Sequence, residues 1–111
     1  MAVLFIDPGR LRTEIALEAC AREPDGLGGF TETWVEAATL FACIEPITAD
    51  SAFGADQTLE TVTHRIALRR RDGVASGMRF NRQGRLFDIL TVHDPDESGR
   101  YLVCKVREAG A

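Results

Sequence analysis

The sequence predicts an all-β protein, a small barrel or sandwich of about six short strands with one long loop. Two observations support this fold class. Apolar and polar residues alternate over several short stretches, which is typical of strands that bury one face. Turn signals, mostly glycine or proline beside aspartate or asparagine, separate these stretches at regular intervals. The length of 111 residues fits one domain, which we expect to span residues 1–111.

Two strands are expected in the first half of the chain. Residues 11–21 alternate between apolar and charged side chains, and we interpret them as a strand although residues 14–23 also contain good helix formers. Residues 24–29 are rich in glycine, which tolerates the positive φ angles of tight turns, so they are expected to form a hairpin tip. A longer strand over residues 33–47 follows and ends near Pro46, because proline has no N–H group for the sheet.

Residues 48–60 form the longest stretch without alternation. Most of their side chains are small or polar, and only Phe53 and Leu59 are large and apolar. A loop longer than about a dozen residues in a compact domain is usually functional or disordered. We therefore expect a loop outside the core, with room for a short helical turn capped by Asp50 or Ser51.

The second half of the chain predicts four more strands. The clearest alternation covers residues 62–68, and the other expected strands are residues 78–80, 86–92 and 101–107. Turn signals separate all four. The expected core consists of apolar members of these strands, namely Ile66, Leu68, Leu86, Ile89, Leu102 and Val106.

The charge and the cysteines exclude several classes of protein. The formal net charge of −4 argues against general nucleic-acid binding by phosphate neutralisation. Cys20, Cys43 and Cys104 are odd in number and widely spaced, which argues against a disulfide framework or a zinc site. They are interpreted as small buried hydrophobic residues in a reducing compartment. The apolar run near the N-terminus is too short for a signal peptide or a membrane span, so we expect no membrane association.

No constellation of catalytic residues can be assembled from the sequence. His64 and His93 lie far apart, and His64 falls on the apolar face of its strand, where a satisfied core or interface histidine is the default interpretation. The acidic residues of segment 94–99 lack the spacing of a calcium loop and are interpreted as a solvated turn. We therefore expect no enzyme activity, no metal and no cofactor.

The three adjacent arginines of residues 69–71 are the strongest basic feature. In a strand they would point to alternate faces and form no single basic stripe. A solvated strand end or salt bridges to a neighbouring subunit are therefore favoured over DNA binding, because the overall charge balance of the chain is acidic. The candidate contacts between subunits are Arg69, Arg70, Arg71, Asp96 and Glu97.

A series of short segments runs through nearly the whole chain in a fixed order. The segments are GRLR at residues 9–12, GGFTETW at 28–34, ACIEP at 42–46, THRI at 63–66, RDGV at 71–74, MRF at 78–80, GRLFDI at 84–89, DPDE at 94–97 and YLVCK at 101–105. No single segment is specific, but together they resemble the phage head–tail joining family, also called head-closure or stopper proteins.

The resemblance implies a structural protein of a tailed phage, a prophage or a gene transfer agent. Its expected fold is a small β-barrel, and its copies are expected to form a ring at the head–tail connector of the particle. Its implied partners are other copies of itself, a portal or adaptor protein on the head side, and a tail terminator or tail protein on the tail side. Double-stranded DNA passes through such a ring without sequence-specific binding, and the ring retains the packaged DNA.

The resemblance also gives the 48–60 loop a role, because the corresponding loop of better-understood members projects toward the channel and helps to close it. The implied channel-facing residues are Thr48, Asp50, Ser51, Phe53, Asp56 and Gln57. Two alternatives stay open. One is another connector or tail-end completion subunit of the same particle. The other is a small nucleic-acid-binding module with an OB-like barrel, which would require exposed aromatic residues along a basic groove.

Overall fold

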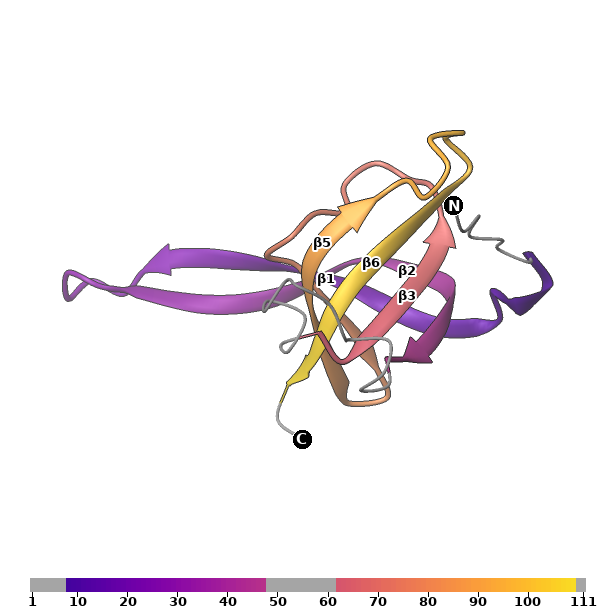
Figure 1. Cartoon of the computed structure of the whole chain (residues 1–111). Helices are drawn as coiled ribbons and strands as arrows, with labels where there is room; N and C mark the ends of the chain where they lie inside the picture. The colour runs from indigo at the N-terminus through magenta and orange to yellow at the C-terminus, as the bar shows by residue number, and fades with distance from the viewer. Residues whose placement is uncertain (1–7, 48–61, 110–111) are drawn as a thin grey trace.

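The computed structural model describes residues 8–47 and 62–109, and these residues form a closed barrel of six antiparallel strands (Figure 1). A short 3-10 helix, η1 (Pro8–Arg10), precedes the first strand. The strands are β1 (Thr13–Pro24), β2 (Phe30–Pro46), β3 (His64–Arg69), β4 (Arg79–Arg82), β5 (Arg85–His93) and β6 (Tyr101–Ala109).

The order of the strands around the barrel is β1-β2-β3-β6-β5-β4, and every neighbouring pair is antiparallel. The barrel closes where β4 pairs with the middle of β1, with Leu17 opposite Phe80. Closure pairs the edges that an open sheet would leave exposed to other chains. Only the parts of strands that extend past the barrel still offer an edge.

The core consists of the inward-facing side chains of all six strands. The largest fully buried residues are Phe80, Phe87, Ile15, Leu17, Ile66, Leu68, Val103, Val106 and Cys104. Four of the six predicted core residues are confirmed as buried, namely Ile66, Leu68, Ile89 and Val106.

The other two predicted core residues are only half-buried. Leu86 was assigned to the wrong face, because its neighbour Phe87 is fully buried and successive residues of a strand point to opposite faces. Leu102 packs against the core cluster without being enclosed by it. The core of β5 is therefore formed by Phe87 and Ile89.

The all-β fold class and the number of strands are confirmed, while the bounds of several elements differ from those expected. β1 and β2 have 12 and 17 residues, close to the expected lengths, but β1 ends three residues later than the expected strand over residues 11–21 and β2 begins three residues earlier than the expected strand over residues 33–47. Within the described residues, the single short helix, η1, lies at a position where only a turn was expected. The helical turn expected in residues 48–60 falls outside the described residues.

The extra length of β1 and β2 forms a two-stranded ribbon that projects from the barrel (Figure 1). We call residues 18–36 the hairpin arm. The described part of the molecule measures 53 × 30 × 26 Å, and the hairpin arm accounts for the long dimension in Figure 1. β1 pairs with β4 only as far as Glu18, and the rest of β1 has β2 as its single partner.

A β-bulge marks the point where the arm leaves the barrel. Leu17 pairs with Ala38 and Glu18 pairs with Glu36, so Ala37 has no opposite residue. A bulge bends its strand and increases the local twist, which redirects the chain. The bulge therefore explains why the hairpin departs from the barrel wall at this position.

Candidate functional site

The base of the hairpin arm is held by a cluster of polar and aromatic side chains. Arg79 of β4 donates a 2.6 Å hydrogen bond to the carboxylate of Glu18, and Asn81 donates a second one of 3.1 Å. The guanidinium of Arg79 also lies over the ring of Trp34, with its Cζ atom 4.2 Å from the ring centroid. One arginine therefore joins both strands of the arm to the barrel.

The Arg79–Glu18 pair in this cluster is less exposed to solvent than any other ion pair of the described residues. The side chains of Arg79 and Glu18 are 20% and 14% exposed. Burial alone would raise the pKa of Glu18, but the hydrogen bonds from Arg79 and Asn81, together with the charge of Arg79, outweigh this effect and lower the pKa below its usual value. Glu18 is therefore ionised and paired at neutral pH.

The tip of the arm is a tight turn organised by Asp25. Its carboxylate accepts hydrogen bonds from the backbone N–H groups of Leu27, at 2.7 Å, and Gly29, at 3.1 Å. These two bonds lower the pKa of Asp25. Gly26 and Gly28 have φ angles of 80° and 89°, which residues with a Cβ rarely adopt. The predicted hairpin tip is confirmed, and its shape is fixed by specific interactions.

Apolar side chains along the hairpin arm face solvent. Leu27 is 90% exposed, Phe30 is 60% exposed and Val35 is 50% exposed. Arg22 lies over the ring of Phe30, 4.9 Å from the centroid, and forms a 4.0 Å ion pair with Glu32. Exposed apolar residues that cluster on a projecting element mark an interaction surface more often than scattered ones do.

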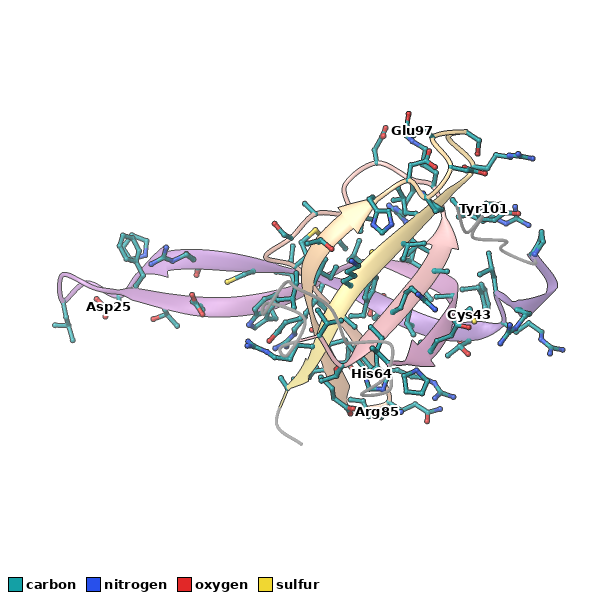
Figure 2. The ribbon with its side chains drawn as sticks, in the orientation of Figure 1. Asp25, Cys43, His64, Arg85, Glu97 and Tyr101 are labelled. Carbon is teal, nitrogen blue, oxygen red and sulfur yellow. The ribbon has the colours of Figure 1, made fainter. Side chains whose placement is uncertain are left out.

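A second surface, which we call the arginine groove, lies at the other end of the molecule. It has a volume of about 270 Å³ and is lined by Pro8, Leu11, Thr39, Leu40, Phe41, Leu68, Arg69, Arg70 and Arg71. Leu11 packs with Cys43 and Tyr101, and Figure 2 shows these two labelled residues on the side of the barrel opposite Asp25. The side chain of Phe41 is 57% exposed.

The three arginines do not follow the alternating arrangement that a strand would impose. β3 ends at Arg69, and Arg70 and Arg71 lie beyond it, so all three line the same groove. Arg70 forms a 3.3 Å ion pair with Asp72, and the Nε atom of Arg71 donates to the carbonyl of Asp72 at 3.3 Å. The groove therefore has an apolar floor and a concentrated positive charge.

The other two candidate contacts between subunits, Asp96 and Glu97, lie in the exposed loop between β5 and β6. Within this loop, Asp94 accepts a 2.6 Å bond from the N–H of Gly99, and Asp96 accepts a 3.1 Å bond from the N–H of Ser98. Bonds from Ser98 lower the pKa of Asp96. The loop also adjoins the arginine segment, because the N–H of Arg70 bonds to the carbonyl of Arg100 at 2.9 Å.

His64 is a partly buried packing residue, in agreement with its interpretation from the sequence as a core or interface histidine. Its ring packs edge-on against Phe87, with 5.1 Å between centroids, and its Nδ1 atom lies 2.9 Å from the hydroxyl of Thr63. Burial lowers the pKa of His64. The negative charge of Glu108 opposes this shift, and the positive charge of Arg85 adds to it. Arg85 and Glu108 form a bidentate pair of 2.8 and 3.0 Å at the same end of the barrel (Figure 2).

The candidate channel-facing residues Thr48, Asp50, Ser51, Phe53, Asp56 and Gln57 lie outside the described residues. The described residues that flank this segment are joined, since the N–H of Ile47 bonds to the carbonyl of Thr63 at 2.9 Å. Ile47 and Thr63 therefore lie side by side at the end of the barrel where β3 begins with His64.

The described residues include no group of three or more His, Cys, Asp or Glu side chains that could hold a metal ion. In the same part of the chain, no helix is long and apolar enough to cross a membrane. Burial raises the pKa of the Cys104 thiol to about 12, so this thiol is a poor nucleophile at neutral pH. The described residues also present two surface features, the exposed apolar side chains of the hairpin arm and the arginine groove.

Comparison with known protein families decides the assignment. The model of the phage head completion protein family matches residues 6–109. The chain belongs to this family. A phage head completion protein is a structural component of a phage particle or of a particle derived from a phage, and the head–tail joining resemblance of the sequence is thereby confirmed at the level of the family.

Two solved structures resemble this head completion protein over almost its whole length. One is a chain in the virion of a native gene transfer agent particle, with 27% identity, a TM-score of 0.70, and coverage of 92% of this chain and 98% of that chain. The other is the solution structure of protein SF1141 from Shigella flexneri 2a, with 26% identity, a TM-score of 0.78, and coverage of 95% and 98%. No curated protein matches the chain at a significant level.

Sequence reasoning predicted the hairpin but not its projection from the barrel. It placed the end of the first strand at Ala21 and the start of the second at Thr33, so it left the three outermost pairs of the ribbon, Arg22 with Glu32 to Pro24 with Phe30, outside both strands. A usable signal was present, because Asp25 and the glycines specify a tight tip, and a tight tip forces the flanking residues to pair.

Proposed function

We propose that this head completion protein is the head-closure subunit of its particle. Its copies form a ring between the portal–adaptor assembly and the tail, retain the packaged DNA and provide the surface on which the tail docks. What supports the proposal is the combination of family membership with two candidate contact surfaces, the exposed apolar arm and the arginine groove, at opposite ends of the molecule. A ring requires this arrangement, because each subunit must contact one neighbour with one surface and the next neighbour with another.

The charge of the chain is compatible with a channel that DNA must traverse. A net charge of −4 repels the phosphate backbone and disfavours binding to it. The arginines of the chain are also largely committed to carboxylates, as in the Arg79–Glu18, Arg85–Glu108 and Arg107–Asp88 pairs. The gene transfer agent virion that contains a similar chain supports the same placement in a particle.

The proposal is tested by deleting the gene and supplying the chain from a second copy. Without the chain, heads should lose their packaged DNA and free tails should accumulate, which nuclease-resistant DNA and electron micrographs measure. Restoring the chain should restore both. Tailed particles that hold their full DNA without the chain would overturn the proposal. Full heads that retain DNA but lack tails would instead assign the chain to a later tail-joining step.

The proposed channel role of residues 48–60 has its own test, shortening of the chain across residues 52–57. Loop length changes the free energy of folding only slowly, and Ile47 and Thr63 are already joined, so the barrel should still form. Particles that join tails but lose DNA support a role in closing the channel. Particles that retain DNA but cannot join tails support docking of a neighbouring ring. Normal titre with full DNA retention would contradict both roles.

A further inference from the structure

We infer that the tip of the hairpin arm of one subunit binds in the arginine groove of a second copy of this chain. The inference rests on the proposed ring and identifies the surfaces that form its repeating contact. The arm presents Leu27 and Phe30, and the groove presents an apolar floor and three arginines. The contact is heterologous, because a different surface of each subunit takes part, as ring closure requires.

The arm is incomplete as an isolated element. Beyond Glu18 it consists of two strands with no third strand, and two-stranded hairpins are marginally stable in water. One face carries small or β-branched side chains, which include Ala19, Ala21 and Val35. Such a ribbon gains stability when another surface covers it. We therefore expect another surface to cover the arm in the assembled state.

The charges of the two surfaces are complementary. The tip segment, residues 22–32, contains Arg22 against Glu23, Asp25 and Glu32, so its net charge is −2. The described residues that line the groove include three arginines and no carboxylate, and within that part of the chain only Arg70 of the three forms an ion pair, with Asp72 beside the groove. Arginine forms bidentate, charge-assisted hydrogen bonds with carboxylates, and these bonds favour a defined orientation. An acidic tip with apolar side chains matches a basic groove with an apolar floor.

The arm cannot reach the groove of its own chain. Thr39, Leu40 and Phe41 line the groove and belong to β2, the same strand that begins at Phe30 in the tip. The extended strand between them keeps Phe30 and Phe41 far apart, with an upper limit of about 36 Å at roughly 3.3 Å per residue. Figure 2 shows Asp25 and Tyr101 at opposite sides of the molecule. The occupant of the groove must come from another molecule.

Disulfide trapping tests the contact in the purified full-length protein. Leu27→Cys and Phe41→Cys are combined in a chain that also carries Cys20→Ser and Cys43→Ser. Mild oxidation at high protein concentration should give a ladder of covalent oligomers, because each subunit can be linked at both ends. Either cysteine alone should give no species larger than a dimer. The matched control replaces Phe41→Cys with Thr91→Cys, at an exposed position of β5 outside the groove, and should give a much lower yield of oligomers larger than a dimer.

Charge reversal supplies a second measurement on the same ladder. Arg71→Glu should reduce the yield of trapped oligomers several-fold, and combining it with Glu23→Arg should restore part of the yield. Added salt should lower the yield of the original pair, because exposed charges are screened. An oligomer yield that neither charge reversal nor salt changes would overturn the charge-matched contact. Equal ladders with Phe41→Cys and Thr91→Cys would overturn the assignment of the groove.

The outcome separates this inference from the proposed function. A ladder without any particle defect on gene deletion would leave the contact intact and overturn the head-closure role. A particle defect on gene deletion without a ladder would leave the role intact and overturn the contact.

Discussion

The anchoring of the hairpin arm predicts a measurable coupling between Glu18 and Arg79. Their 2.6 Å charge-assisted hydrogen bond is largely shielded from water, with side-chain exposures of 20% for Arg79 and 14% for Glu18. A hydrogen bond to a charged group contributes about 1.5–3 kcal/mol. Asn81 keeps one bond to Glu18 when Arg79 is removed, so we expect the lower part of this range, about 1.5–2 kcal/mol.

A double-mutant cycle measures this coupling. Arg79→Met and Glu18→Gln are made singly and together, and the free energy of unfolding is obtained from urea titrations at neutral pH. The contact between Arg79 and Trp34 is lost in both variants that carry Arg79→Met, so it cancels in the cycle when it does not depend on Glu18. Trp34 is the only tryptophan, and its fluorescence therefore reports the state of the arm base directly.

The Arg85–Glu108 pair is the matched control. It is bidentate and similarly short, at 2.8 and 3.0 Å, but its side chains are 46% and 22% exposed. Solvent screens an exposed pair, so its coupling should be clearly smaller and should fall more with added salt. Equal couplings in the two cycles, or a Glu18–Arg79 coupling below about 0.5 kcal/mol, which is the range of ordinary surface changes, would refute the argument that burial makes this pair the anchor.

The remaining predictions concern the barrel and the isolated subunit. Phe87→Ala should cost about 3–5 kcal/mol in urea unfolding, whereas Leu86→Ala should cost much less, because Phe87 is fully buried and Leu86 is not. The pKa of His64 is lowered from 6.5 in the folded chain, so stability should decrease as pH falls below 6.5 and level off below the folded pKa; His64→Gln should remove this part of the pH dependence. Sedimentation velocity should find the purified subunit monomeric or weakly associated, because ring contacts of this kind are completed on a template that raises the local concentration. A stable ring of the isolated protein at micromolar concentration would contradict this expectation.

The barrel could be predicted from the sequence because its strands bury one face. Residues 62–68 alternate cleanly, and the structure places Ile66 and Leu68 in the core. Prediction failed where two apolar residues are adjacent in one strand, as Leu86 and Phe87 are in β5. Alternation alone does not tell which of two adjacent apolar residues points inward, and only the packing of Phe87 against the other strands decides it.

The candidate surfaces were only partly predictable. The arginines of residues 69–71 were recognised, but their convergence on one groove depends on the end of β3 at Arg69, and strand ends are the least certain feature of a sequence-based assignment. The remaining lining comes from η1, its connection to β1, and β2, which are distant in sequence. Such a surface is produced by the closure of the barrel and has no linear pattern.

The projection of the hairpin arm escaped prediction for a different physical reason, which bears on its role. Periodic patterns reveal strands because one face packs on the core of the same chain. The outermost pairs of the arm, Arg22 with Glu32 and Pro24 with Phe30, have no such core beneath them, and their residues are exposed. A sequence selected to fold only within its own barrel would gain nothing from these pairs. These outermost pairs, and a tip fixed by Asp25, are consistent with selection for a contact outside the chain. In the contact that we infer, the arginine groove of a second copy supplies a surface of matching charge.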